Sequence, residues 1–166
     1  MIEWIKNLIS RYVEKGILID TNVLLLYFIG RCDPNQISKF KRTRQFVIED
    51  YELLIDLLHS FKKIITTPNI LTEVSNLSGQ LGEPFKTEFF THFVSEISTL
   101  EEHYVASQEA IKIEEFVKVG LTDSCIFDLS KDKYLVLTDD FKLSQYLQKK
   151  SIDVINFNHI RPLGWT

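Results

Sequence analysis

The chain has 166 residues, of which 45% are hydrophobic and 25% charged, and this is typical of one globular domain with its own core. Its net charge of −4 comes from 19 basic and 23 acidic residues. That balance argues against a protein that mainly coats nucleic acid, although it does not exclude a nuclease with acidic metal ligands. Six glycines and four prolines are few for an all-β sandwich. We expect a single domain over residues 1–166.

The sequence also indicates a compartment and excludes several kinds of site. The N-terminal segment is too charged for a secretory signal, and no run of about 18 uncharged apolar residues predicts a membrane span. Cys32 and Cys125 lie far apart, as expected for free thiols in a reducing cytoplasm. The cysteines and the four histidines show no metal-ligand spacing, and no glycine loop could bind phosphates. We expect a cytoplasmic protein without a zinc site, a membrane contact or a nucleotide cofactor.

The first third of the chain predicts two helices around a buried strand. Apolar residues at helical spacing predict a helix over 2–14, within an N-terminal extension that covers 1–15. The apolar run at 16–20 predicts a buried parallel strand. A helix over 23–29, closed by Gly30, should follow it. A polar, basic segment over 31–44 and a helix over 45–61 then form an enlarged loop–helix region, 31–62.

The remainder alternates strands with helices. Strands are predicted over 63–67, 134–138 and 153–157. Helices are predicted over 68–78, with Thr67 as its cap and Pro68 in its first position, and over 83–102, 111–119, 123–130 and 142–149. Gly120 should end the third of these helices, and Thr122 should cap the fourth. This order predicts an α/β fold, a three-layer α/β/α sandwich with a central parallel sheet, whose ligands bind at the carboxyl ends of the strands.

Several acidic residues stand where these strand ends would lie. Asp20 directly follows the first strand, where a helix cap is the alternative interpretation. Glu73 lies at the edge of the apolar face of its helix, where burial of an unpaired carboxylate is costly, unless its head group reaches solvent. Asp123 faces the core side of its helix, although a carboxylate in the first turn also stabilises the helix dipole. Asp139 and Asp140 follow the third strand, and a turn would explain only one of them.

Clustered carboxylates favour cation binding. Two like charges about 4 Å apart repel by roughly 1 kcal/mol in water and about 4 kcal/mol at an intermediate dielectric constant. Such a cluster therefore takes up protons or binds cations. Mg²⁺ and Mn²⁺ suit oxygen ligands, and both ions activate water for attack at phosphorus. Metal-assisted hydrolysis of a phosphodiester is the expected chemistry.

Four segments together resemble the PIN-domain nucleases. They occur in order between about residues 17 and 157: Ile17-Leu18-Ile19-Asp20-Thr21-Asn22, Thr72-Glu73, Leu121-Thr122-Asp123-Ser124 and Val136-Leu137-Thr138-Asp139-Asp140. The resemblance implies a PIN-like sandwich that cleaves RNA with Mg²⁺ or Mn²⁺. By position it implies that the catalytic residues and metal ligands are Asp20, Glu73, Asp123 and Asp140, with Asp139 as a further ligand or a substitute for Asp140. It also implies that Thr21, Asn22 and Thr138 organise the site.

Small bacterial members of this family include VapC-type toxins, so an antitoxin protein is a candidate partner beside RNA. The N-terminal extension and the enlarged region 31–62 depart from those compact toxins. A phosphatase of the haloacid-dehalogenase kind is an enzymatic rival, but it needs an aspartate where Asn22 stands. An inactive PIN scaffold that binds RNA or protein is the second rival. All four acidic positions are filled, which argues against it.

Two further clusters are open to interpretation. Basic residues interleaved with Phe40 and Phe46 could hold phosphates while the rings stack on bases, or they could form a solvated loop. These basic residues are Lys39, Lys41, Arg42 and Arg44. A second cluster, rich in phenylalanine, is interpreted as core in preference to a dimer surface, although a homodimer is the expected assembly. It comprises Phe85, Phe89, Phe90 and Phe93.

Overall fold

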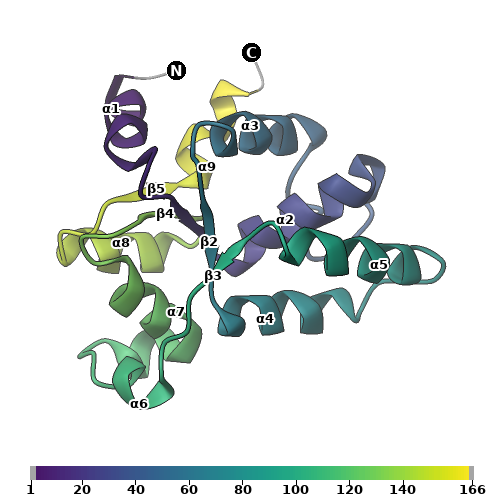
Figure 1. The fold of residues 1–166 in the computed structure, drawn as a ribbon. Helices are drawn as coiled ribbons and strands as arrows, with labels where there is room; N and C mark the ends of the chain where they lie inside the picture. The colour runs from purple at the N-terminus through teal and green to yellow at the C-terminus, as the bar shows by residue number, and fades with distance from the viewer. Residues whose placement is uncertain (1–2, 165–166) are drawn as a thin grey trace.

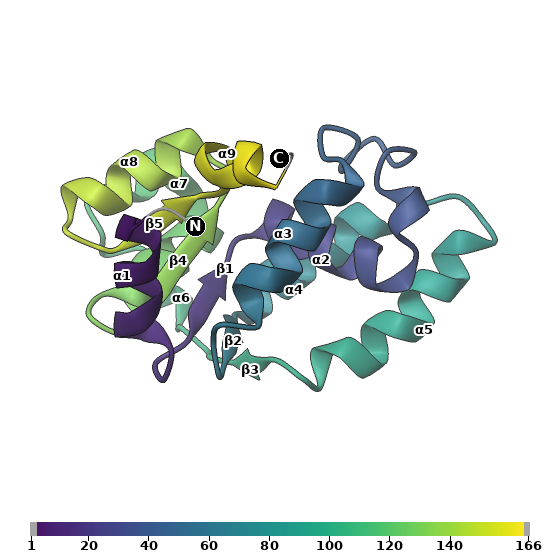
Figure 2. The same ribbon diagram turned by 90° about the horizontal axis from the view of Figure 1, so that it is seen from above.

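The computed structural model describes residues 3–164 and is an α/β domain built on a five-stranded sheet. All neighbouring strands are parallel, in the order β3-β2-β1-β4-β5 (Figure 2). The strands are β1 (Ile17–Ile19), β2 (Ile64–Thr66), β3 (Glu101–Glu102), β4 (Leu135–Thr138) and β5 (Val154–Asn156). β1 is central, and the β1–β4 pair brings the segments after Ile19 and Thr138 to one edge of the sheet.

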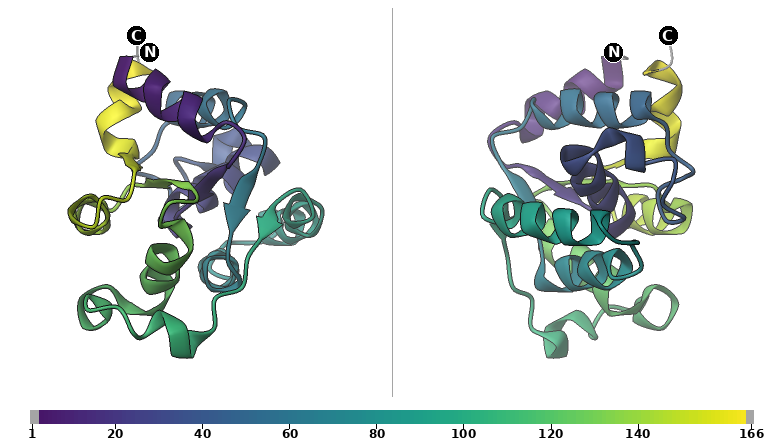
Figure 3. Two further views of the ribbon diagram at one scale, coloured as in Figure 1. Left: turned by 60° about the vertical axis from the view of Figure 1, so that its left-hand side comes forward. Right: turned by 90° about the vertical axis from the view of Figure 1, so that its right-hand side faces the viewer.

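Helices cover the sheet above and below. Figure 1 and the left view of Figure 3 place α1, α3 and α9 on one side of the strands and α4 and α7 on the other. The helices are α1 (Glu3–Tyr12), α2 (Thr21–Cys32), α3 (Ile48–Leu58), α4 (Pro68–Ser78), α5 (Phe85–Ile97), α6 (Ser107–Ala110), α7 (Phe116–Ser130), α8 (Phe141–Lys149) and α9 (Phe157–Ile160). Short 3₁₀ turns occupy Pro34–Gln36 and Arg161–Leu163. Among the described residues, none of these helices combines the length and apolar character that crossing a membrane requires.

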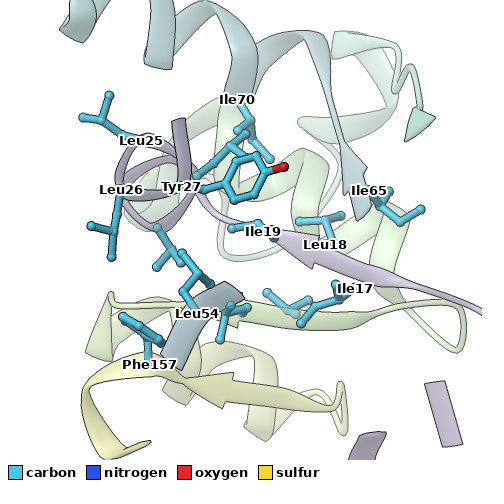
Figure 4. Close-up of a cluster of buried hydrophobic side chains, with 14 of the residues drawn as sticks. Ile17, Leu18, Ile19, Leu25, Leu26, Tyr27, Leu54, Ile65, Ile70 and Phe157 are labelled. Atoms are coloured by element: carbon cyan, nitrogen blue, oxygen red, sulfur yellow. The ribbon is translucent and has the colours of Figure 1, made fainter. Parts of the chain in front are cut away.

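The core is continuous through the sheet and α2. Every residue of β1 and β4 is buried, which explains why these strands are apolar throughout instead of alternating. α2 is buried over almost its whole length, and its leucines pack beside β1 and α3 (Figure 4). The phenylalanine cluster also belongs to this core, because Phe85, Phe89 and Phe93 are buried and Phe90 packs against it. The interpretation of that cluster as core is confirmed.

Most predicted elements are confirmed, with shorter bounds for several. Residue 2 of the first predicted helix, 2–14, lies outside the described residues, and the helix is confirmed as α1, which ends two residues earlier, at Tyr12. The helix over 68–78 is confirmed as α4, and Thr67 caps it by accepting the backbone N–H of Ile70 at 3.2 Å. The helix over 45–61 is reduced to α3.

The prediction that Gly30 ends α2 is wrong. α2 begins at Thr21, directly after Asp20, and runs on through Gly30 to Cys32. A Cβ at Gly30 would collide with the ring of Tyr51 in α3. Gly30 therefore permits a close approach of α3 to α2.

Two predictions about the second half are also wrong. The helix over 83–102 ends at Ile97, and the chain then forms β3, in which Glu101 pairs with Ile65 and Glu102 with Thr66. The helical stretch at 111–119 is mostly turns, and only its last residues belong to α7. Gly120, whose backbone is non-helical with a φ of 82°, ends the first segment of α7 as predicted, and a second helical segment begins after this kink. Thr122 lies inside that second segment and does not cap it.

Candidate active site

Asp20 lies at the carboxyl end of β1 and caps α2. It is only 7% exposed. One carboxylate oxygen accepts the backbone N–H of Thr21 at 2.7 Å, and the other accepts the hydroxyl of Thr138 at 2.6 Å. Burial raises the pKa of Asp20 to about 6 against the lowering effect of these two hydrogen bonds, and Asp139 and Asp140 add to the rise. The interpretation of Asp20 as a helix cap is therefore correct. Asp20 also lies close to other carboxylates, which a helix cap does not require.

Glu73 reaches the same edge from the middle of α4. The hydroxyl of Thr21 donates to its Oε2 at 2.9 Å, and the hydroxyl of Thr122 donates to its Oε1 at 2.5 Å. Thr21 thus connects Asp20 and Glu73, through its backbone N–H to the first and its side chain to the second. Although Glu73 is solvent-exposed, two threonine hydroxyls from different helices hold its carboxylate in place.

Asp123 is the acid most affected by the others. It projects from the first turn after Gly120 in α7 and is partly buried. Desolvation, together with the carboxylates of Asp20, Asp140 and Glu73, raises the pKa of Asp123 to about 8. Electrostatic coupling of this kind requires proximity. The structure thus brings together the four acidic residues that the sequence analysis singled out.

Asp139 and Asp140 occupy different surroundings. Oδ1 of Asp140 accepts the backbone N–H groups of Lys142 and Leu143 at 2.7 and 3.0 Å, so this carboxylate caps α8. Asp139 accepts the side-chain amides of Asn22 at 3.3 Å and Gln45 at 3.1 Å. Burial raises the pKa of Asp139. Either residue keeps carboxylate lone pairs for a cation, and the geometry does not favour Asp140 over Asp139.

The donor set fits a hard divalent cation. Every side chain at the centre offers carboxylate or hydroxyl oxygen, which Mg²⁺ and Mn²⁺ prefer. Within residues 3–164, no three of these acids have oxygens mutually within 4.8 Å. A shared cation would draw these carboxylates together by offsetting their mutual repulsion.

A groove opens beside Glu73. It has a volume of about 280 Å³, and its lining comes from α4, α7 and the segment after β3. Tyr104 lines this groove and is 79% exposed. An exposed aromatic ring next to a carboxylate cluster offers a flat apolar surface that a nucleobase could cover.

The basic segment reaches the acidic centre at one end. Lys39, Lys41, Arg42 and Arg44 are all exposed, but Phe40 and Phe46 are buried in the core. The interpretation that these two rings stack on bases is therefore wrong. Gln45, the next residue after Arg44, donates to Asp139. The four basic residues thus lie in the chain directly before a residue that contacts the acidic centre.

Several polar groups at this edge of the sheet were not predicted from the sequence. Gln45 and Asn158 lie far from Asp139 in the chain, yet Gln45 donates to its carboxylate and Asn158 donates to its backbone carbonyl at 2.9 Å. Thr122 was assigned to a cap but binds Glu73. For Thr122, its place directly before Asp123 in the acidic motif was a usable signal. No local pattern marks Gln45 or Asn158.

A second group of metal-ligand atoms lies elsewhere. Cys32, Glu88 and His92 place one ligand atom each within 4.8 Å of one another, and no other described group of three or more acidic, histidine or cysteine side chains does so. These residues show no metal-ligand spacing in the sequence, and it is the packing of the fold that brings Cys32 close to Glu88 and His92. Both thiols are nevertheless free, with Cys32 half-buried and Cys125 buried, as predicted.

The arrangement at the sheet edge therefore consists of four coupled carboxylates, three threonines that position two of them, an adjoining groove and an adjoining basic segment. No model of a known protein family matches the chain, and no curated protein matches it either.

Proposed function

We propose that the protein is a Mg²⁺- or Mn²⁺-dependent endoribonuclease of the PIN type, which hydrolyses RNA phosphodiester bonds. The observation that carries this proposal is the clustering of acids at Asp123, a partly buried residue whose pKa is raised first by desolvation and then by three further carboxylates. Burying like charges together is costly unless a cation offsets them. A shifted acid in such a cluster is characteristic of a functional site.

Each side chain of the centre has a role in this proposal. Asp20, Glu73 and Asp123 would hold the cation, with Asp140 or Asp139 as the fourth acid. Thr138 and Thr21 fix the orientation of Asp20, and Thr21 with Thr122 fixes that of Glu73. When bound, Mg²⁺ or Mn²⁺ activates water and stabilises charge at the attacked phosphate. Asn22 orients Asp139 through its amide.

RNA would approach across the charged and aromatic surfaces beside the centre. The phosphates fit the exposed basic side chains that precede Gln45, because cations contribute much of the affinity for a nucleic-acid backbone. A base adjacent to the scissile phosphate fits the groove at Tyr104. Recognition of this kind suits single-stranded RNA, whose bases are free to leave the stack.

The biological setting belongs to the same proposal. A cytoplasmic toxin with this activity would require an antitoxin partner, and a homodimer is the expected assembly. Expression of the active chain in a bacterial host should then arrest growth. The Asp20→Asn variant should not arrest growth.

RNA cleavage in vitro tests the proposal directly. Wild-type protein should cleave members of a panel of end-labelled single-stranded and hairpin RNAs in Mn²⁺, and EDTA should abolish cleavage. Asp20→Asn and Asp123→Asn should each reduce the rate by more than about 100-fold, since each removes a charge that supports the transition state. Asp128→Asn is the matched control, because Asp128 is exposed on the same helix as Asp123.

An inert wild-type protein, or variants that cleave equally well, would refute the proposal. If the wild-type protein binds the RNA panel without cleaving it, the inactive scaffold takes the place of the enzyme. Comparable affinity of Asp20→Asn and wild type in that assay would support the scaffold further.

A further inference from the structure

We infer that Cys32, Glu88 and His92 form a zinc-binding site, separate from the acidic centre. The three residues come from two helices that pack together, with Cys32 at the end of α2 and the other two on α5 (Figures 1 and 2). Glu88 and His92 are four residues apart in α5, so both face the same side of the helix. This inference is independent of the proposed nuclease activity.

The distances suit a single ion. The thiol sulfur, a carboxylate oxygen and an imidazole nitrogen lie within 4.8 Å of one another. In a tetrahedral zinc site with Zn–S of about 2.3 Å and Zn–N of about 2.0–2.1 Å, neighbouring ligand atoms are roughly 3.5 Å apart. Small rotations of the exposed Glu88 and His92 side chains would bring the ligand atoms from within 4.8 Å to the spacing of a zinc site. A water molecule would be the fourth ligand of the ion.

The packing around the site holds its two helices in register. The rings of Phe28 and Phe93 meet edge to face with their centroids 4.9 Å apart. Arg31 forms an ion pair with Glu96 at 3.1 Å, and the hydroxyl of Tyr27 also donates to Glu96. Cys32 directly follows Arg31, and His92 directly precedes Phe93. Three contacts between α2 and α5 thus fix where the ligand-bearing positions meet.

The side chains of Glu88 and His92 have no competing partner in the protein. Within residues 3–164, neither makes a hydrogen bond or an ion pair. Glu88 also lines a groove of about 600 Å³ beside Lys39 and Lys41, which gives an ion access from solvent. The ligands are therefore reachable and free to turn toward a shared ion.

The donor chemistry selects the metal. Sulfur, imidazole nitrogen and carboxylate oxygen together suit Zn²⁺, whereas Mg²⁺ and Mn²⁺ favour all-oxygen sites. Burial, with Glu88 and Asp33 nearby, raises the pKa of the Cys32 thiol to about 11. Binding would break the S–H bond, form the S–Zn bond and release one proton to solvent. The thiolate and the Glu88 carboxylate together would balance the charge of the ion.

A cobalt titration followed by zinc competition tests the site. Apo-protein titrated with Co²⁺ should show a sulfur-to-cobalt charge-transfer band that saturates at one ion per chain, and Zn²⁺ should abolish the band by displacement. Cys32→Ala should lose the band. His92→Ala should bind Co²⁺ more than about 100-fold more weakly. Loss of a residue that only hydrogen-bonds to a metal ligand already reduces metal affinity by about 10- to 100-fold, and loss of a ligand should cost more.

Two controls separate this site from the rest of the molecule. Cys125→Ala removes the other thiol, which is buried away from the group, and should leave the band unchanged. Asp20→Asn with Asp123→Asn removes the acidic centre and should leave it unchanged too, whether or not the protein cleaves RNA. Since His92 is exposed, its variant should fold normally by circular dichroism. Absence of a band in the wild type, or a band of equal affinity in folded His92→Ala, would overturn the inference.

Discussion

Asp123 shows most clearly how a functional charge opposes stability at the scale of a single residue. Its carboxyl is partly buried beside three other acids, and desolvation together with these acids raises its pKa to about 8. Above that pH the metal-free fold must hold an ionised group that it disfavours. Natural sites often retain such a cost because function requires the charge.

Asp123→Asn should therefore stabilise the metal-free protein at pH 8 while it abolishes RNA cleavage. The expected gain is on the order of 1 kcal/mol, because each pKa unit corresponds to about 1.4 kcal/mol and solvent screening discounts the total. Urea unfolding in EDTA measures it. Asp128→Asn, exposed on the same helix, should change the free energy of unfolding by less than about 0.5 kcal/mol. A less stable Asp123→Asn variant would contradict the assigned repulsion.

Tyr104 provides a test of how RNA binds beside Glu73. Base stacking on an aromatic ring is worth about 1–3 kcal/mol, so Tyr104→Ala should weaken binding of single-stranded RNA by roughly 5- to 150-fold. Tyr104→Phe should bind like the wild type, since the ring remains. Fluorescence anisotropy with Asp20→Asn as the background measures affinity without cleavage. The groove does not bind a base if Tyr104→Ala retains full affinity.

The acidic residues were predictable from local patterns, and the family resemblance implied that Thr21, Asn22 and Thr138 organise the site, but neither gave the individual contacts. Asp20 follows an apolar strand, and Glu73 lies at the edge of an apolar helix face, which are features of nearby sequence. The hydroxyl bonds of Thr21 and Thr122 to Glu73 join residues 52 and 49 positions apart. Such contacts depend on how three helices pack, and apart from the place of Thr122 directly before Asp123 the local sequence does not indicate them.

At the scale of elements, Gly30 controls the spacing of α2 and α3. Gly30→Ala should destabilise the protein by about 1–3 kcal/mol, because the new methyl group must displace the ring of Tyr51 in a packed core. Combining it with Tyr51→Leu should recover part of the loss, since the ring is then absent. Thermal or urea unfolding measures both effects.

Gly82→Ala is the matched control for that pair, because a Cβ at Gly82 meets no atom within 4 Å. It should leave the free energy of unfolding nearly unchanged. Equal effects of Gly30→Ala and Gly82→Ala would indicate a general loss of backbone freedom, and the packing explanation would then fail.

The elements that were not predicted from the sequence are those whose conformation depends on packing against other elements. β3 has only two residues, both glutamates, and carries none of the apolar or β-branched character of a strand. It forms because β2 offers an unpaired edge for backbone hydrogen bonding. Gly120 ends the first segment of α7, as its residue type predicts, but the sequence does not show that its positive φ turns the second segment so that Asp123 lies near the other acids. The short, buried apolar strands and the capped α4 needed no such context, and local patterns sufficed to predict them.

At the scale of the whole molecule, the acidic centre should link stability to both pH and magnesium. The pKa values of Asp20 and Asp123 are raised to about 6 and about 8 from ordinary values of 3.8. Between about pH 4 and pH 8 the metal-free native state therefore binds more protons at these groups than the unfolded chain does. Their contribution to stability is present at low pH and declines as pH rises through that window.

Magnesium should reverse this decline by binding the ionised carboxylates of the folded state alone. The increase in melting temperature on adding Mg²⁺ should accordingly be larger at pH 8 than at pH 5.5, measured by thermal unfolding against EDTA. Mg²⁺ is the suitable ion here because it does not favour the thiolate and imidazole of Cys32 and His92. The double variant Asp20→Asn with Asp123→Asn should show neither the magnesium effect nor its pH dependence. A magnesium effect that is equal at both pH values, or that survives in the double variant, would place cation binding outside the four-carboxylate centre.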